Sequence, residues 1–313
     1  MSTSDPILVT GAAGQVGGIG RQVVALLRGR DMPVRALVRR DDDRAVHLRG
    51  LGAEVVIADL TRSEQVAPAL DGCRRAYFGM SVSASYLEAA LVMAAAARVR
   101  HDFELLVHMS QMTVSQMDLT RMTDSPQQRQ HWLAEQALDW SGVPVTHVRP
   151  TVLQENPFFM ASAAESIAQS GTIRLPFGRG RTSPVAARDV AEVVATVLLD
   201  PGPYLGRALE LTGPRSADLY AFAEEYASAL GRPVAYREIP LETWCDEDLG
   251  RRGLPEHVFQ HLRTMAELHA ANRYDRLTDT IERILRRPPT SLGDTVRRNR
   301  QLFQRSEPAP QRA

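Results

Sequence analysis

Short apolar runs alternate with amphipathic stretches through the first half of the chain. The run 7–10 has the pattern of a buried strand, and after it Val23, Val24 and Leu27 fall on one face of a helix. The same alternation predicts strands at 34–38, 54–58, 75–80, 104–109 and 144–149, with helices at 43–51, 63–70, 85–97 and 127–141 between them. This order predicts an α/β fold in which parallel strands, joined by right-handed crossovers, form a doubly wound sheet.

The rhythm changes after Pro150. Helices are expected at 158–169, 187–199 and 216–230, the last one closed by Gly231, and short strands at 172–175, 208–211 and 234–238, with helices in the remainder. We therefore expect a Rossmann domain at 1–155, to which 182–212 returns. A smaller, mostly helical substrate-binding domain would occupy 156–305, and 306–313 would be a flexible tail.

The chain contains no lysine, since all 37 of its basic residues are arginine. Schiff-base chemistry, P-loop nucleotide hydrolysis and protein-kinase chemistry each need a lysine, so these function classes are excluded. An arginine cannot replace that lysine as a nucleophile or proton donor, because it stays charged at any working pH.

The overall charge and the apolar pattern exclude further classes. The formal net charge is +0, which gives no argument for a nucleic-acid or membrane partner, and no apolar run reaches the length of a membrane span. Cys73 and Cys245 form no metal cluster or disulfide framework, and we expect no metal. The first residues lead directly into a strand without a signal-peptide pattern, which predicts a cytoplasmic protein.

A glycine-rich loop joins the first strand to the first helix. Gly11, Gly14 and Gly17 are spaced as in a dinucleotide-binding turn, where glycine lets the backbone approach the pyrophosphate and the helix N-terminus attracts its charge. Gly18 and Gly20 follow before the helix proper, so we expect a longer, looser entry to the helix. Whether this insertion is ornamental or forms a mobile cover over the phosphates stays open.

The end of the second predicted strand favours NADP(H) over NAD(H). An NAD site places an acid there, whereas Arg39 and Arg40 offer guanidinium groups that suit a 2′-phosphate. The alternative is that both arginines pair with the acids at 41–43. We expect those acids to cap the next helix instead.

Three stretches resemble the NmrA-like branch of the atypical short-chain dehydrogenases/reductases. They are the glycine-loop segment 9–17 with the strand 34–39, the segment 142–156 (GVPVTHVRPTVLQEN), and the segment 184–191 (PVAARDVA). The resemblance covers about residues 6–240. Relatives in this branch include quinone, azo-dye and triphenylmethane reductases, and redox-sensing regulators that bind the nucleotide without turning it over.

The resemblance implies a set of cofactor-binding residues. They lie in the glycine loop, after the third, fourth and fifth strands, and after the sixth strand, next to the nicotinamide. Together with Arg39, Arg40 and His131, they are Thr10, Gly11, Ala13, Gly14, Gln15, Val16, Gly17, Asp59, Leu60, Phe78, Gly79, Met80, Ser110, Pro150 and Thr151.

The chain departs from the wider superfamily in its catalytic residues. The usual relay is Tyr-x-x-x-Lys, but the positions aligned with it hold Gln127 and His131. Histidine can donate a proton near neutral pH, so His131 and Ser110 are the candidate catalytic residues. A surface histidine without a role is the alternative. The other seven histidines are read as structural, since none has metal-ligand spacing.

Apolar side chains gather where ligands bind in a doubly wound fold. Methionines adapt to irregular partners and aromatic rings stack on planar ones, which favours a flat, apolar substrate, although each residue alone could be ordinary core. The candidate substrate-pocket residues are Met109, Met112, Trp132, Asn156, Phe158 and Phe159.

Two functions from different classes remain. The first is an NADPH-dependent reductase that transfers hydride to a conjugated acceptor such as a quinone, azo compound or imine. The second is a non-catalytic NADP(H)-sensing regulator whose arginine-rich C-terminal region contacts a partner. An accessory enzyme that holds the nucleotide for a non-redox step is a weaker third. A small-molecule substrate is the expected partner, and a homodimer stays open.

Overall fold

The computed structural model describes residues 5–14 and 16–304. Its main sheet has seven parallel strands in the order β3-β2-β1-β4-β5-β6-β8. These are β1 (Ile7–Val9), β2 (Val34–Val38), β3 (Glu54–Ile57), β4 (Arg75–Phe78), β5 (Leu105–Met109), β6 (Val145–Pro150) and β8 (Ala208–Leu211). The predicted doubly wound parallel sheet is therefore confirmed, with the reversal of strand order between β1 and β4 that marks a ligand-binding edge.

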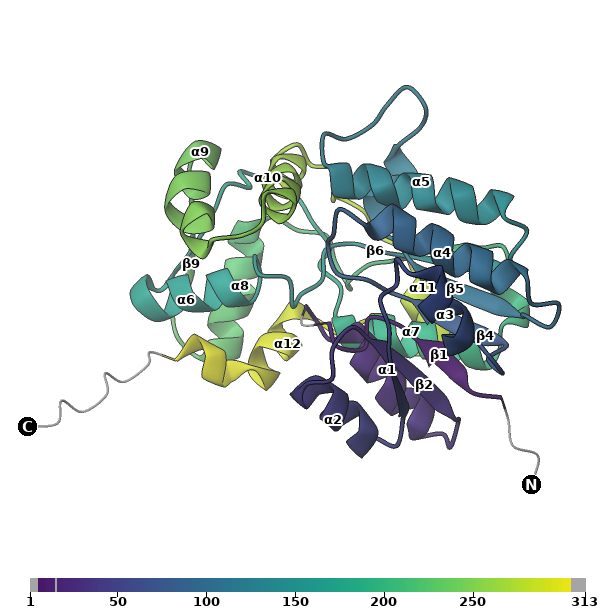
Figure 1. Cartoon of the computed structure of the whole chain (residues 1–313). Coiled ribbons are helices and arrows are strands. Elements are labelled where there is room, and N and C mark those ends of the chain that lie inside the picture. The colour runs from purple at the N-terminus through teal and green to yellow at the C-terminus, as the bar shows by residue number, and fades with distance from the viewer. Residues whose placement is uncertain (1–4, 15, 305–313) are drawn as a thin grey trace, which may run out of the picture.

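Helices cover both faces of this sheet (Figure 1). One face packs on α1 (Ile19–Arg28), α2 (Asp43–Gly50) and α7 (Ala187–Leu199), and the other on α3 (Ser63–Ala69), α4 (Tyr86–Arg98) and α5 (Pro126–Trp140). Each helix turns its apolar stripe inward, as Val23, Val24 and Leu27 do in α1. The result is a three-layer α/β/α arrangement.

A second core lies beside the sheet and has its own small sheet (Figure 1). There β7 (Thr172–Leu175) pairs in parallel with β9 (Ala235–Glu238). Around it pack α6 (Ala161–Ser170), α8 (Leu219–Leu230), α9 (Leu241–Trp244), α10 (Glu256–Ala270) and α12 (Leu292–Arg298). Gly231 ends α8 in the left-handed conformation, as predicted.

Two details of the second half differ from the sequence expectation. The helix expected from residue 158 begins only at Ala161, because Asn156 caps a preceding turn by accepting the N–H of Phe158. In addition, α11 (Thr280–Leu285) places Ile281 in the core of the main sheet, although its range was expected in the second domain. The tail predicted at 306–313 lies outside the described residues.

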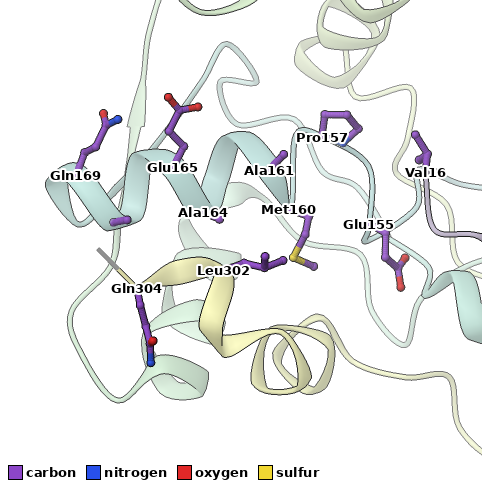
Figure 2. A pocket seen from close by; sticks show the side chains of 11 residues that line it. Val16, Glu155, Pro157, Met160, Ala161, Ala164, Glu165, Gln169, Leu302 and Gln304 are labelled. Atoms are coloured by element: carbon purple, nitrogen blue, oxygen red, sulfur yellow. The ribbon is translucent and has the colours of Figure 1, made fainter. Parts of the chain in front are cut away.

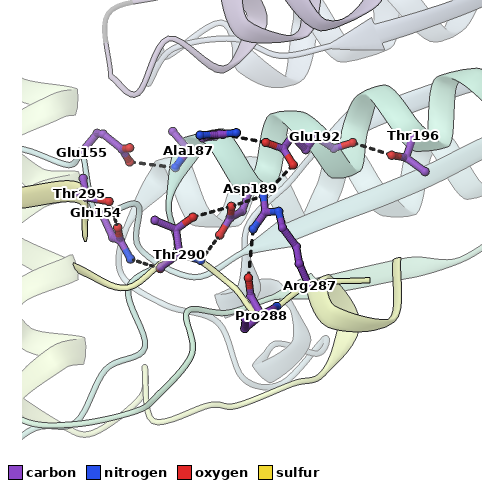
Figure 3. A network of polar contacts seen from close by, with 11 residues as sticks. Gln154, Glu155, Ala187, Asp189, Glu192, Thr196, Arg287, Pro288, Thr290 and Thr295 are labelled. Atoms are coloured by element: carbon purple, nitrogen blue, oxygen red, sulfur yellow. Dashed lines mark hydrogen bonds and ion pairs between the residues drawn. The ribbon is translucent and has the colours of Figure 1, made fainter. Parts of the chain in front are cut away.

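A buried polar network holds the C-terminal segment on α7 (Figure 3). The carboxylate of Asp189 is fully buried and accepts hydrogen bonds from the N–H (2.6 Å) and hydroxyl (2.9 Å) of Thr290 and from Arg287 (2.7 Å). Gln154, four residues beyond the end of β6, donates to the carbonyl oxygens of Pro184 and Thr290. Residues of three distant segments are thus joined at the start of α7. Among the residues that the structure describes, no helix has the length and apolar character to cross a membrane.

Candidate cofactor and active site

The glycine loop is held against the β4–α4 loop at a distance that only glycine allows. Gly11 has φ +65°, and a Cβ there would lie 2.4 Å from the carbonyl oxygen of Gly79. Thr10 fixes this approach, because its hydroxyl accepts from the N–H of Gly79 (3.0 Å) and donates to the carbonyl of Gly79 (2.9 Å). A Cβ at Gly20 would lie 2.8 Å from the backbone of Ala12. The loop therefore forms a cradle in which positions 11 and 20 have no room for a side chain.

The helix that follows the loop begins at an uncapped N-terminus. Gly17 and Gly18 both have positive φ and precede α1, which starts at Ile19; Gly20, expected before the helix, lies instead in its first turn. Among the described residues no side chain caps α1, and its first turn holds no acid, which leaves backbone N–H groups for an anion. Gln15 lies outside the described residues, and Val16 is half exposed.

Two of the arginines after β2 are not used in ion pairs. Asp42 caps α2 as predicted, accepting the N–H of Arg44 at 3.0 Å, and it also pairs with the Arg44 guanidinium. Asp41 pairs with Arg49 at 2.7 Å. Within the described part of the chain, Arg39 and Arg40 form no salt bridge, so the acids at 41–43 do not occupy their guanidinium groups.

Sequence reasoning missed a third arginine at this edge. Arg44 donates to the carbonyl oxygen of Ala13 in the glycine loop at 3.1 Å. Only the fold brings the first turn of α2 to this loop, since the two are 31 positions apart. Nearby, Asp59 accepts from the N–H and hydroxyl of Thr61, and these bonds, together with the charge of Arg39, hold the pKa of Asp59 below its usual value.

The carboxyl ends of β5 and β6 carry the other predicted residues. Ser110 is bonded through its N–H to Val148, but its buried hydroxyl has no partner within the described structure. The Thr151 hydroxyl donates to the Ser183 carbonyl (2.6 Å), which ties the end of β6 to the segment before α7. Pro150 closes β6, and Leu60, Phe78 and Met80 pack in or against the α3–α4 core.

The hydrogen bonds around Gln127 fix the tautomer of His131. The Gln127 carbonyl oxygen accepts the N–H of Ser83 (3.0 Å) and the Nε2–H of His257 (2.8 Å), so its NH₂ group donates to His131 Nε2 (3.1 Å). A neutral His131 then carries its proton on Nδ1. This Nδ1–H is buried, and in the described structure it has no acceptor.

Burial keeps His131 neutral. Removal from water, with a smaller contribution from His261, lowers the pKa of His131 to about 3. His131 is therefore a hydrogen-bond donor at neutral pH and not an imidazolium. Its Nδ1–H and the Ser110 hydroxyl are therefore buried donors for which the described structure offers no acceptor.

The predicted substrate residues are not brought together. Phe158 and Phe159 are 1% exposed in the second core, and Asn156 forms the turn before them. Trp132 forms a small separate cluster with Val114, which lies in the η1 segment (Met112–Gln116), and with Met117, the next residue after that segment. Met112 is buried, and Met109 packs partly against the core of the main sheet. Long-range packing, which the local pattern does not reveal, places these side chains.

A cavity opens instead between the glycine loop and α6 (Figure 2). Its volume is about 720 Å³, and Figure 2 shows Val16 and Glu155 at one end and Gln169 at the other. Glu155 accepts the N–H of Ala187 at 2.9 Å, and burial raises the pKa of Glu155. The remaining lining is mostly apolar, with Pro157, Met160, Ala161, Ala164 and Leu302 among its residues.

These features fit a dinucleotide. The glycine cradle and the uncapped start of α1 suit a pyrophosphate, and Arg39 and Arg40 lie at the strand end where the adenosine ribose binds. The Ser110 hydroxyl directly follows β5 and His131 lies in the second turn of α5, and in the described structure neither the hydroxyl nor Nδ1 has a hydrogen-bond partner.

Comparison with known proteins agrees with this geometry. A family model described as NAD(P)H-binding matches residues 11–201. The chain is 28% identical over 302 residues to an NAD(P)H azoreductase of Xenophilus azovorans, covering 95% of this chain and 99% of the relative.

Solved structures show the same fold. The NADPH-dependent quinone oxidoreductase of Escherichia coli, complexed with NADPH, has a TM-score of 0.80 at 21% identity, covering 94% of this chain and 99% of that chain. NmrA, a negative transcriptional regulator solved with NADP, has a TM-score of 0.78 at 14% identity, covering 94% and 95%. The chain belongs to the NAD(P)H-binding, NmrA-like family of atypical short-chain dehydrogenases/reductases.

Proposed function

We propose that this NAD(P)H-dependent oxidoreductase uses NADPH to reduce a flat, apolar conjugated acceptor of the quinone, azo or imine type. The observation that carries the proposal is the buried, unpartnered Nδ1–H of His131, which takes the place of the missing Tyr-x-x-x-Lys relay. The names of an azoreductase and a quinone oxidoreductase among similar proteins support this class of acceptor.

The donors at the site suit an acceptor that needs polarisation more than a strong acid. The bound dihydronicotinamide supplies the hydride. His131 and Ser110 would donate hydrogen bonds to the oxygen or nitrogen of the acceptor on which negative charge develops. Because the pKa of His131 is about 3, His131 stabilises that charge as a neutral donor, and the final proton comes from water. An acceptor that is already electron-poor reacts under these conditions.

The preference for NADPH rests on Arg39 and Arg40. Both are exposed at the end of β2 and form no salt bridge among the described residues, so their guanidinium groups are available to a 2′-phosphate. Arg39→Ala should lower the ratio of NADPH affinity to NADH affinity by about tenfold to a hundredfold. Arg207→Ala, an exposed arginine before β8, is the matched control. An unchanged ratio in Arg39→Ala would show that Arg39 does not select NADPH over NADH.

Turnover is tested directly. The protein is incubated with NADPH and a panel of quinones, azo dyes, imines and aldehydes, and nicotinamide absorbance is followed. We expect oxidation with the conjugated acceptors, and a fall in kcat of about a hundredfold in His131→Ala. Tight NADPH binding without oxidation above background on the whole panel would refute the reductase. Full turnover in His131→Ala would remove only His131 from the mechanism.

A non-catalytic NADP(H) sensor is the second candidate. The absence of the usual relay at Gln127 and His131 favours it. A sensor should bind NADP⁺ and NADPH with different consequences for a partner, and it should not oxidise NADPH. The acceptor panel therefore separates the two functions.

A further inference from the structure

A hydrogen-bonded chain of side chains leads from the surface into the protein beneath the proposed site. Asp139, with an exposed side chain on α5, lies 3.0 Å from His147 Nε2 on β6. The Nδ1 atoms of His147 and His108, on the neighbouring strand β5, are 2.9 Å apart. His108 Nε2 lies 2.8 Å from the hydroxyl of Tyr86, which donates to the carbonyl of Met109 at 2.6 Å. The proposed reaction uses none of these groups.

The number of protons needed by these hydrogen bonds determines the charge of the two histidines. Tyr86 has one hydroxyl proton, and since that proton is given to the Met109 carbonyl, the Tyr86 oxygen accepts the Nε2–H of His108. The Asp139 carboxylate can only accept, so His147 Nε2 carries a proton as well. A third proton lies between the two Nδ1 atoms. Two neutral imidazoles hold two protons, and this arrangement requires three.

We propose that His147 and His108 form a buried proton-binding site that carries one positive charge. This shared cation keeps Tyr86 in place, and through Tyr86 it positions His131. His147, His108 and Tyr86 are thus positioning residues for the reduction. Their role in turnover rests on the proposed function, whereas the charge of the pair does not.

The extra proton resides on His147. His108 is fully buried, and desolvation, with smaller effects of His147 and Arg149, lowers the pKa of His108 well below its usual value. The charge is therefore placed next to Asp139, whose side chain is 56% exposed. This end of the chain of hydrogen bonds can exchange its proton with solvent.

The surrounding charges balance a cation at this position. Glu135, which is 1% exposed, forms a salt bridge with Arg149, a residue that also lies 4.0 Å from Glu210. Glu210 is in turn paired with Arg276 at 3.1 Å. The positive charges of Arg149 and the histidine pair then match the negative charges of Glu135 and Asp139. Within this set, a neutral histidine pair would leave only the half-exposed carboxylate of Asp139 without a matching positive charge.

A metal ion fits the same position less well. Ligand atoms of His108, His147 and Glu135 lie within 4.8 Å of one another. However, Glu135 directs both carboxylate oxygens to Arg149, and a dication would add two charges beside that guanidinium. A tetrahedral zinc site separates two nitrogens by about 3.3 Å, and the observed 2.9 Å is a hydrogen-bond distance.

The cation connects to the proposed site through Tyr86. The Tyr86 and His131 rings pack with their centroids 4.0 Å apart, and the Met109 carbonyl held by Tyr86 directly precedes Ser110. Burial, with smaller effects of Tyr77 and Glu135, raises the pKa of Tyr86, which keeps its hydroxyl protonated. Loss of the shared proton would break one of the three hydrogen bonds made by the two imidazoles, and Tyr86 would be held less firmly.

The charge of the pair can be measured without any substrate. ¹⁵N NMR of the uniformly labelled protein at pH 7.5 should show both ring nitrogens of His147 protonated, with assignment by loss of the signals in His147→Gln. An ordinary histidine would be about 9% protonated at this pH. A neutral His147 would overturn the proposal, and so would one zinc ion per chain detected by elemental analysis.

The positioning role is tested by the pH dependence of turnover. Asp139→Asn keeps an acceptor for His147 but removes the negative charge, so the pair should lose its proton at lower pH. We expect the alkaline fall in kcat to begin about one pH unit lower than in the wild type. His101→Gln, an exposed histidine after α4, should leave the profile unchanged. An unchanged profile in Asp139→Asn overturns the positioning role, whereas a protein without turnover refutes the proposed function and leaves the NMR result decisive.

Discussion

The side chain of Thr10 and the backbone of Gly79 form a reciprocal pair of hydrogen bonds, 2.9 and 3.0 Å long, in a fully buried position. This pair joins the loop after β1 to the loop after β4, on either side of the point where the strand order reverses. A dinucleotide crosses the sheet at such a point. The hydroxyl of one threonine therefore sets the width of the cofactor cradle.

Thr10→Val should weaken NADPH binding by about tenfold. The change removes both bonds and leaves the N–H and carbonyl of Gly79 buried without a partner, which costs about 1–3 kcal/mol. Isothermal titration measures the affinity. Thr10→Ser keeps the hydroxyl and should bind NADPH as the wild type does, so equal affinities in Val and Ser variants would contradict this account.

Gly11→Ala should abolish tight NADPH binding. The added Cβ would lie 2.4 Å from the Gly79 carbonyl oxygen in a backbone conformation with φ +65°, so the two loops must separate. We expect a loss of stability of about 1–3 kcal/mol in urea unfolding and no measurable affinity in titration. Gly202→Ala is the control, because a Cβ at Gly202 meets nothing within 4 Å. Equal behaviour of both variants would contradict the cradle.

The glycine-loop half of the cradle could be predicted from the sequence because its residues are consecutive after a recognisable strand, whereas Gly79 on the other side is 69 positions from Thr10. The same holds for Asp42, whose capping of α2 depends on a neighbour two positions away. The pairing of His108 with His147 could not be predicted, since 39 residues separate them and only the register of β5 with β6 places them opposite one another. The position of Phe158 in the core could not be predicted either, because aromatic residues are favoured both in a pocket for a flat ligand and in a protein core.

Asp189→Asn should destabilise the protein by about 3 kcal/mol. The buried carboxylate accepts three hydrogen bonds, two of them from Thr290 and one from Arg287, and an amide would turn a donor toward one of these donors. Urea unfolding provides the measurement. Asp279 pairs with Arg283 at 3.0 Å, but both side chains are about two-thirds exposed, so Asp279→Asn should not change the midpoint. Similar losses in both variants would contradict a special role for the Asp189 network.

Acid should unfold the protein near pH 5. Burial lowers the pKa values of His131 and His269 to about 3 and that of His261 to about 4, whereas the unfolded chain binds these protons near pH 6.5. This stability is fully present above pH 6.5 and is lost as the pH falls toward the folded values. Each histidine contributes a loss of about 2 kcal/mol at pH 5, and about 6 kcal/mol together, comparable to the whole stability of a domain. Urea unfolding between pH 7.5 and 5 measures the slope. It should fall by about a third in His261→Gln and stay unchanged in His101→Gln, and a flat wild-type profile would show that these histidines are not buried as neutral groups.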